Sequence, residues 1–139
     1  LNLTRIDYDD LNARQKENYN FQKLSAVLAD YGFVTLRLSD DWQGADFIAQ
    51  HIDGNTFIKV QLKGRLTFAE KYCGRELYVA FQVNGEWYLF PHDEVLQLFL
   101  SATTIENTES WQIYRGYSFP GLSRIAKQIL QPYKIVEHK

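Results

Sequence analysis

The chain has 139 residues, a hydrophobic fraction of 45%, a charged fraction of 23% and a formal net charge of −2. These values predict one globular domain spanning residues 1–139 and exclude a disordered chain, because the aromatic fraction of 15% supplies large apolar area for burial. No apolar run approaches the roughly 20 residues of a membrane span, no signal-peptide pattern begins the sequence, and Cys73 is the only cysteine, so we expect a cytoplasmic protein.

Positive charge is concentrated in one segment. Residues 59–75 carry five basic side chains and one acid, which gives this segment a net charge of +4. The net charge of the whole chain argues mildly against a nucleic-acid partner, whereas a local cluster of cations suits phosphate contacts. The cluster is therefore either a solvated strand end with its loop or a phosphate-binding surface.

The first predicted helix begins near Asp10 or Asn12, either of which can cap it, and ends at Tyr31 before Gly32. Glu17 falls on the apolar stripe of this helix at the helical spacing of roughly 100 degrees per residue. The other members of the stripe are Phe21, Leu24, Leu28 and Tyr31. We therefore expect Glu17 to face inward, although its charge also suits the helix dipole or a pair with Arg14 or Lys16.

Apolar and β-branched runs predict a series of strands after this helix. They cover residues 32–38, 45–52, 56–63, 76–83 and 86–90. A loop at 39–44, a turn over 53–55, a basic connection at 64–75 and a hairpin turn at Asn84-Gly85 join them.

The C-terminal part of the sequence predicts two more helices and one more strand. The helices cover residues 93–100 and 122–130, with Pro132 ending the second, and they are separated by a loop at 101–110 and a strand at 111–119. A helix, a run of strands and then helices predict an α+β fold, arranged as an α/β/α sandwich around a mixed, largely antiparallel sheet.

The hairpin formed by residues 45–63 places three polar side chains on one face. A turn at Asp53-Gly54 sets Asp46 opposite Gln61, and a turn at Gly54-Asn55 sets Asp46 opposite Lys63. Directly opposed residues of an antiparallel pair point the same way, and side chains alternate along a strand. Both registers therefore predict that Asp46, Gln61 and Lys63 share a face.

These residue types suit a hard divalent cation. Asp46 offers a carboxylate, Gln61 an amide oxygen and Leu62 its backbone carbonyl, and Glu17 could add a second carboxylate. Lys63 is suited to orient an attacking water or to stabilise charge in the transition state of phosphodiester hydrolysis. An amide in place of an acid predicts weaker metal binding than an all-carboxylate site would have.

The order of these residues resembles the PD-(D/E)XK nuclease superfamily, whose members include restriction endonucleases, archaeal Holliday-junction resolvases and some homing endonucleases. The resemblance covers about residues 14–83 and departs from the pattern at Gly44-Ala45, where the family has a proline, and at Gln61, which replaces an acid. It implies a restriction-endonuclease-like fold, with Asp46 and Gln61 as metal ligands, Lys63 as the family's lysine and Glu17 as its helical acid.

The implied function is a metal-dependent DNA endonuclease that uses Mg²⁺, with Mn²⁺ as a possible substitute, on duplex or branched DNA. Phosphate contacts are expected from Arg65 and Lys71, with Arg37 and Arg75 behind them. A homodimer is plausible, because a chain of this size has little room for a separate sequence-reading domain. The alternative is a nuclease-fold DNA-binding or interaction module that has lost its chemistry, which Gln61 and the acidic total charge favour.

Two further expectations concern side chains outside this site. Cys73 has no recognisable partner in the sequence, and His92 shows no ligand spacing to it, so a zinc site is not expected and His92 is assigned to the start of a helix. Aromatic residues able to stack on bases are assigned mainly to the core or its rim. They are Trp42, Tyr72, Trp87 and Tyr88.

Overall fold

The computed structural model describes residues 1–136, except for the side chains of Asp41 and Trp42. The main sheet has the strand order β1-β2-β3-β5-β6, and β3 and β5 are parallel while the other neighbours are antiparallel. Its strands are β1 (Phe33–Trp42), β2 (Ala45–His51), β3 (Phe57–Leu62), β5 (Leu77–Val83) and β6 (Glu86–Pro91). A second, antiparallel sheet pairs β4 (Thr67–Ala69) with β7 (Gly116–Ser118).

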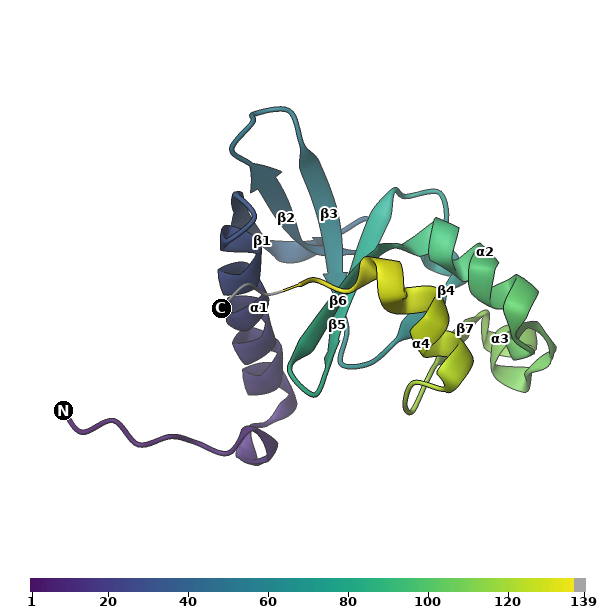
Figure 1. Ribbon diagram of the computed structural model, residues 1–139, viewed down its shortest axis with the longest axis horizontal. Helices are drawn as coiled ribbons and strands as arrows, with labels where there is room; N and C mark the ends of the chain where they lie inside the picture. The colour runs from purple at the N-terminus through teal and green to yellow at the C-terminus, as the bar shows by residue number, and fades with distance from the viewer. Residues whose placement is uncertain (137–139) are drawn as a thin grey trace.

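Helices cover the main sheet on both sides (Figure 1). They are α1 (Ala13–Ala29) on one side and α2 (His92–Ala102) and α4 (Arg124–Leu130) on the other, while α3 (Glu109–Tyr114) packs against β7. Short 3-10 turns are η1 (Tyr8–Asp10), η2 (Glu70–Tyr72), η3 (Ile105–Asn107) and η4 (Gln131–Tyr133). The predicted α/β/α sandwich around a mixed sheet is confirmed. None of the helices in the described part of the chain is long and apolar enough to cross a membrane.

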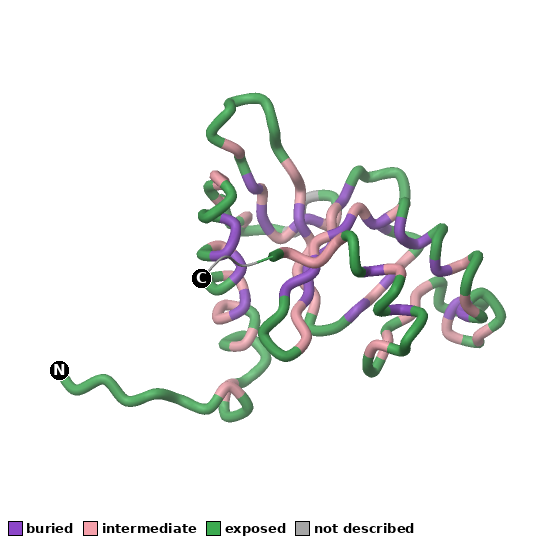
Figure 2. Tube along the Cα trace, in the orientation of Figure 1, coloured by how far each residue is buried: buried purple, intermediate pink, exposed green. Residues whose placement is uncertain are grey.

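Two apolar clusters hold the layers together (Figure 2). On one face, Leu24 and Leu28 of α1 pack against Phe47 and Val60. On the other face, buried side chains of β5 and β6 pack against α2 and α4. This second cluster includes Val79, Phe81, Phe90, Leu96, Phe99 and Leu130. Burial of such large side chains stabilises by roughly 1.5–3 kcal/mol each, so both helical layers are firmly attached to the sheet.

A reciprocal cap starts α1. The side chain of Asn12 accepts from the N–H of Gln15, and the side chain of Gln15 accepts from the N–H of Asn12. Of the predicted caps, Asn12 is therefore the one used. The helix ends at Ala29, earlier than predicted, so Tyr31 lies outside it and is exposed rather than on the inner stripe. Gly32 follows with φ +85°, a backbone conformation that favours glycine.

The β2–β3 hairpin has the first of the two predicted registers. Phe47 pairs with Val60 and Ile48 with Lys59, so the same register continued by one residue sets Asp46 opposite Gln61. The N–H of His51 donates to the carbonyl of Thr56, so the turn is longer than the predicted one. The number of residues in the turn is still even, so the strand pairing keeps the predicted register. Bonds from Asn55 and Thr56 lower the pKa of Asp53 to about 2 and close this turn.

Three predictions about connecting segments are wrong. The loop at 39–44 is largely strand, since β1 continues to Trp42 with an irregularity after Arg37. The connection at 64–75 contains β4 and η2, because β4 gains a partner in β7 that no local pattern reveals. Residues 101–110 form no open loop but contain the end of α2, η3 and the beginning of α3.

The predicted strand at 111–119 is also wrong. Thr108 caps a helix there, its side chain accepting from the N–H of Trp111, and the left-handed conformation of Arg115, at φ 55°, ends that helix. Only residues 116–118 are extended. The pattern of residues 111–114, Trp-Gln-Ile-Tyr, suits a strand and a single helical turn equally well, and the cap decides between them.

Candidate active site

Side chains from α1, β2 and β3 converge on one cavity of about 380 Å³. Its lining includes every residue predicted for the site: Glu17, Asp46, Gln61, Leu62 and Lys63. Tyr8, Lys16 and Asn20 complete the wall on the side of η1 and α1. The main sheet and its first helix therefore gather, in one place, predicted site residues that are up to 46 positions apart in the sequence, from Glu17 to Lys63.

Asp46 is fixed at the beginning of β2. Its Oδ2 accepts a hydrogen bond of 2.8 Å from the backbone N–H of Leu62. The carboxylate therefore ties the start of β2 to the end of β3, and it lies half-buried beside the cavity. A charge-assisted bond of this kind holds the carboxylate in a defined place, which is what a metal ligand requires.

Glu17 pairs with Arg37, not with Arg14 or Lys16. Its Oε1 lies 3.1 Å from Nη2 of Arg37. The other terminal nitrogen of this guanidinium donates to Oδ1 of Asn18, and the group lies over the ring of Phe21. The Glu17 side chain is 54% exposed, so it stands at the rim rather than on the buried stripe. A second hollow of about 660 Å³ adjoins the cavity there, sharing Glu17 and Asp46.

Lys63 follows β3 directly. Its backbone N–H donates to the carbonyl of Ala80 over 2.8 Å, which extends the parallel pairing with β5. Its ammonium nitrogen lies 5.4 Å from the ring centroid of Tyr72. Lys63 also lines a neighbouring hollow of about 770 Å³, together with residues of β4, η2, α3 and β7. The main sheet thus holds this lysine between two concave surfaces.

The predicted phosphate-contacting residues are dispersed around these surfaces. Lys71 lines the larger hollow and Arg37 the 660 Å³ hollow. Arg65 is exposed on the connection after β3, and the Nε of Arg75 donates to the carbonyl of Lys71. Sequence reasoning missed Tyr114, Arg115 and Tyr117, which line the larger hollow from positions far along the chain. No local signal marks them, because α3 and β7 reach the hollow only through tertiary packing.

The aromatic assignments to the core are confirmed where the structure describes the side chains. Tyr72, Trp87 and Tyr88 are buried. The side chain of Trp42 lies outside the described part of the chain.

The donor set around the cavity fits a hard cation. It consists of the carboxylates of Asp46 and Glu17 and the amide oxygen of Gln61, with no sulfur or imidazole among the lining residues. Oxygen ligands of this type are those that Mg²⁺ and Mn²⁺ prefer. Glu17 could join such a set only by giving up part of its bond to Arg37.

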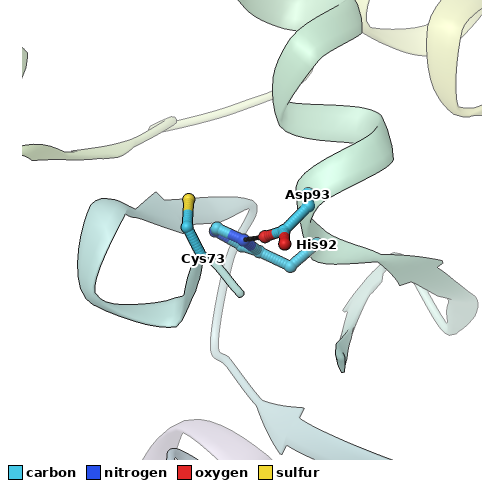
Figure 3. Close-up of side chains that lie close together, drawn as sticks. All are labelled: Cys73, His92 and Asp93. Atoms are coloured by element: carbon cyan, nitrogen blue, oxygen red, sulfur yellow. Dashed lines mark hydrogen bonds and ion pairs between the residues drawn. The ribbon is translucent and has the colours of Figure 1, made fainter. Parts of the chain in front are cut away.

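A second group of ligand-type side chains lies away from this cavity, and it corrects the expectation that Cys73 has no partner (Figure 3). Single ligand atoms of Cys73, His92 and Asp93 all lie within 4.8 Å of one another. His92 begins α2, as its assignment to a helix start predicted, and it is fully buried. Its Nδ1 lies 2.9 Å from Oδ1 of Asp93, and its Nε2 accepts from the N–H of Ala69 over 3.1 Å.

These bonds fix the tautomer of His92. An Nε2 that accepts a hydrogen bond carries no proton, so the neutral ring holds its proton on Nδ1 and donates it to Asp93. Burial lowers the pKa of His92 despite the nearby carboxylate. Asp93 also accepts from the N–H of Gly74 over 2.9 Å. Desolvation, reinforced by Asp93, raises the pKa of the Cys73 thiol. The cluster is a hydrogen-bonded clamp between η2 and α2, and metal binding at Nδ1 would disrupt it.

No protein-family model matches the sequence, and no curated protein matches it significantly. Among solved structures, the chain is similar to the bacterial homing endonuclease I-Ssp6803I, with a TM-score of 0.51 and 15% identity over 88% of this chain and 86% of that chain. It is also similar to Hjc, a Holliday junction resolvase from the archaeal hyperthermophile Archaeoglobus fulgidus, with a TM-score of 0.44 and 20% identity over 55% of this chain and 72% of that chain. The likeness to the homing endonuclease confirms the restriction-endonuclease-like fold that the PD-(D/E)XK resemblance predicted.

Proposed function

We propose that the protein is a metal-dependent DNA endonuclease that hydrolyses phosphodiester bonds at the cavity formed by Glu17, Asp46, Gln61 and Lys63. The observation that carries the proposal is the convergence of these residues on one cavity of about 380 Å³ in a nuclease fold. The oxygen ligands for a metal ion come from the two acids and the amide. The lysine supplies a positive charge that belongs to the protein itself. A metal-assisted hydrolysis of a phosphodiester can use this combination, because oxygen ligands hold the ion and the lysine stabilises developing negative charge.

Each side chain has a distinct part in this proposal. Asp46 and Gln61 would hold Mg²⁺ or Mn²⁺, with the carbonyl of Leu62 as a further ligand. The bound ion would neutralise charge on the scissile phosphate and lower the pKa of an attacking water. Lys63 would donate a hydrogen bond to the water or to a phosphate oxygen and stabilise negative charge there. Glu17 at the rim would hold a water, with Arg37 positioning its carboxylate.

Nicking of supercoiled plasmid in Mg²⁺ or Mn²⁺ tests the proposal. Asp46→Ala and Lys63→Ala should each abolish nicking, while Asp30→Ala and Lys127→Ala, which change exposed residues outside the cavity, should nick as the wild type does. Thermal melting of each variant separates loss of activity from loss of fold. Equal nicking by wild type and both cavity variants would refute the assignment.

A second candidate function is a nuclease-fold binding module without activity. Gln61 favours it, because an amide in place of a carboxylate removes one negative charge from the ligand set and weakens cation binding. Titration with Mn²⁺ in the presence of DNA discriminates between the two. The endonuclease requires a binding site that Asp46→Ala removes, and the inactive module predicts none.

The proposed partner is duplex or branched DNA, bound by a homodimer. The side chain of Thr35 in β1 bonds to Ser25 of α1, so Thr35 faces the helix. Its neighbours Val34 and Leu36 therefore point to the opposite face of the sheet, where 63% and 62% of their surface is exposed. Neighbouring exposed apolar side chains on an edge strand suit burial against a second copy. Light scattering tests this: Leu36→Glu should convert a wild-type dimer into monomers, and a monomeric wild type would refute the dimer.

A further inference from the structure

The 770 Å³ hollow beside the candidate active site is built before any ligand binds. Pairing of β4 with β7 forms its floor, and the N–H of Glu70 donates to the carbonyl of Arg115 over 2.8 Å. The left-handed turn at Arg115 directs the chain from α3 into β7 along its wall. Lys63 lies at the junction with the active-site cavity, because it lines both. A ligand in the hollow and a ligand in the cavity would therefore both contact Lys63.

The hollow is positively charged in a chain whose net charge is −2. Its charged lining consists of Lys63, Lys71, Arg115 and Glu70. Glu70 forms an ion pair with Arg115. The ammonium groups of Lys63 and Lys71 instead lie over the buried ring of Tyr72, at 5.4 and 5.3 Å from its centroid. Tyr72 thus holds two cations on the hollow, and one of them, Lys63, also lines the active-site cavity.

Aromatic side chains line the same surface. Tyr114, at the C-terminal end of α3, is 77% exposed, and Tyr117 of β7 is partly exposed. Exposed rings beside cations are the means by which proteins bind single-stranded nucleic acid, with bases stacked on the rings and phosphates on the cations. Bases within a duplex are already stacked on one another, so a tyrosine in a hollow can reach only an unpaired base.

We infer that this hollow binds an unpaired nucleotide of the DNA strand whose neighbouring phosphate occupies the active site. The preferred substrate is then DNA with a single-stranded segment next to the cleaved bond. The base stacks on Tyr114, and the phosphates on either side contact Lys71 and Lys63. The position of the cleaved bond rests on the proposed function, whereas the binding of an unpaired nucleotide rests on the hollow itself.

Fluorescence anisotropy with labelled DNA tests this inference. Fully paired duplex and a splayed duplex of the same length, with unpaired arms, are titrated with the full chain in Ca²⁺ to avoid cleavage. The wild type should bind the splayed DNA about tenfold more tightly, since stacking on one aromatic ring has roughly this effect. Tyr114→Ala should lose this preference and keep its affinity for the duplex, and Tyr114→Phe should retain the preference.

Matched variants separate stacking from charge. Lys71→Ala should weaken binding to both DNAs with a reduced salt dependence, since it removes a phosphate contact. Lys127→Ala removes an equally exposed cation on α4, outside the hollow, and should bind as the wild type does. Equal affinity of the wild type for the two DNAs would overturn the inference, as would identical behaviour of Tyr114→Ala and Lys127→Ala.

The nicking assay keeps the two proposals apart. A protein that nicks plasmid in an Asp46-dependent way but shows no preference for splayed DNA retains the endonuclease function and loses this inference. A protein with a Tyr114-dependent preference but no metal-dependent nicking retains the nucleotide site and loses the endonuclease function. A protein that binds neither DNA loses the nucleotide site.

Discussion

Ligand-type side chains gather at two places in this molecule, and their surroundings differ. Around Asp46 they are partly exposed oxygen donors that open onto a cavity. Around Asp93 they include a fully buried imidazole whose two nitrogens are both engaged in hydrogen bonds. Short distances between donors are therefore a poor guide to a metal site. What decides is whether the donors open onto a space that can hold an ion or are already committed to one another.

Removal of divalent metal should have the largest effect, and it should affect the cavity at Asp46 but not the cluster of Cys73, His92 and Asp93. Excess EDTA should reduce nicking by at least roughly a thousandfold, because a bound cation contributes several kcal/mol to the stability of the transition state. In Asp46→Ala, which lacks the proposed cation site, the melting temperature should not change on chelation, since hydrogen bonds already join His92 to Asp93 and Asp93 to Gly74. A fall of several degrees in this variant would instead indicate a structural metal ion at Cys73, His92 and Asp93.

Removal of the buried imidazole should mainly affect stability. His92→Ala leaves a cavity and strands the N–H of Ala69, so the free energy of unfolding in urea should fall by about 3 kcal/mol. Gln97→Ala, an exposed change on the same helix, should stay within about 0.5 kcal/mol of the wild type. Urea melts of both variants measure the difference. Equal stability would show that the clamp contributes little.

Acid should weaken the clamp before it affects the rest of the fold. Because the pKa of His92 is lowered from 6.5, the unfolded chain binds a proton that the folded chain does not, and stability should fall as the pH drops below 6.5. The slope should reach at most about 1.4 kcal/mol per pH unit. The raised pKa of Cys73 predicts a second decline above pH 9.0. Urea melts across this range should show the acid slope in the wild type and a reduced one in His92→Ala.

A charge change in the cation site should have the smallest effect. Gln61→Glu adds a carboxylate opposite Asp46 and should tighten Mn²⁺ binding about fivefold, because affinity rises with the number of charged ligands. Gln50→Glu changes the same strand pair away from the cavity and provides the control. Calorimetric titration measures both. Weaker binding by Gln61→Glu would place the cation elsewhere.

The part of the fold that the sequence predicts well depends on local alternation. The hairpin that carries Asp46 and Gln61 follows from strand periodicity and an even-length turn, so the turn could be longer than predicted without moving either side chain to the other face. The inward position of Glu17 was only partly right, since the helix carries it to the rim of the cavity. At the rim, Glu17 forms an ion pair with Arg37 of β1. Periodicity alone does not say where this strand lies relative to the helix, so the pair was not predictable from the sequence.

The remainder depends on contacts between distant residues. Cys73 and His92 are 19 positions apart in the sequence, and β4 finds its partner in β7 almost fifty positions later. No spacing rule connects such segments. The helix at 109–114 was a different case, because Thr108 with an acid after it is a readable cap. The prediction of a strand at 111–119 rests on the apolar pattern alone and takes no account of this cap.

The single parallel pairing in the main sheet, between β3 and β5, has a consequence for how substrate preference can change. Parallel neighbours need a crossover, and here residues 63–76 provide it. This crossover carries Lys63 at its start, and its Lys71 and Tyr72 line the hollow that continues from it. The register of Asp46 and Gln61 is set by the β2–β3 hairpin, and the crossover supports that hairpin because its Tyr72 packs against Ala45 beside Asp46. Substitutions at the exposed positions of this crossover, such as Lys71, would therefore alter which DNA is held while keeping the cleaving residues in place.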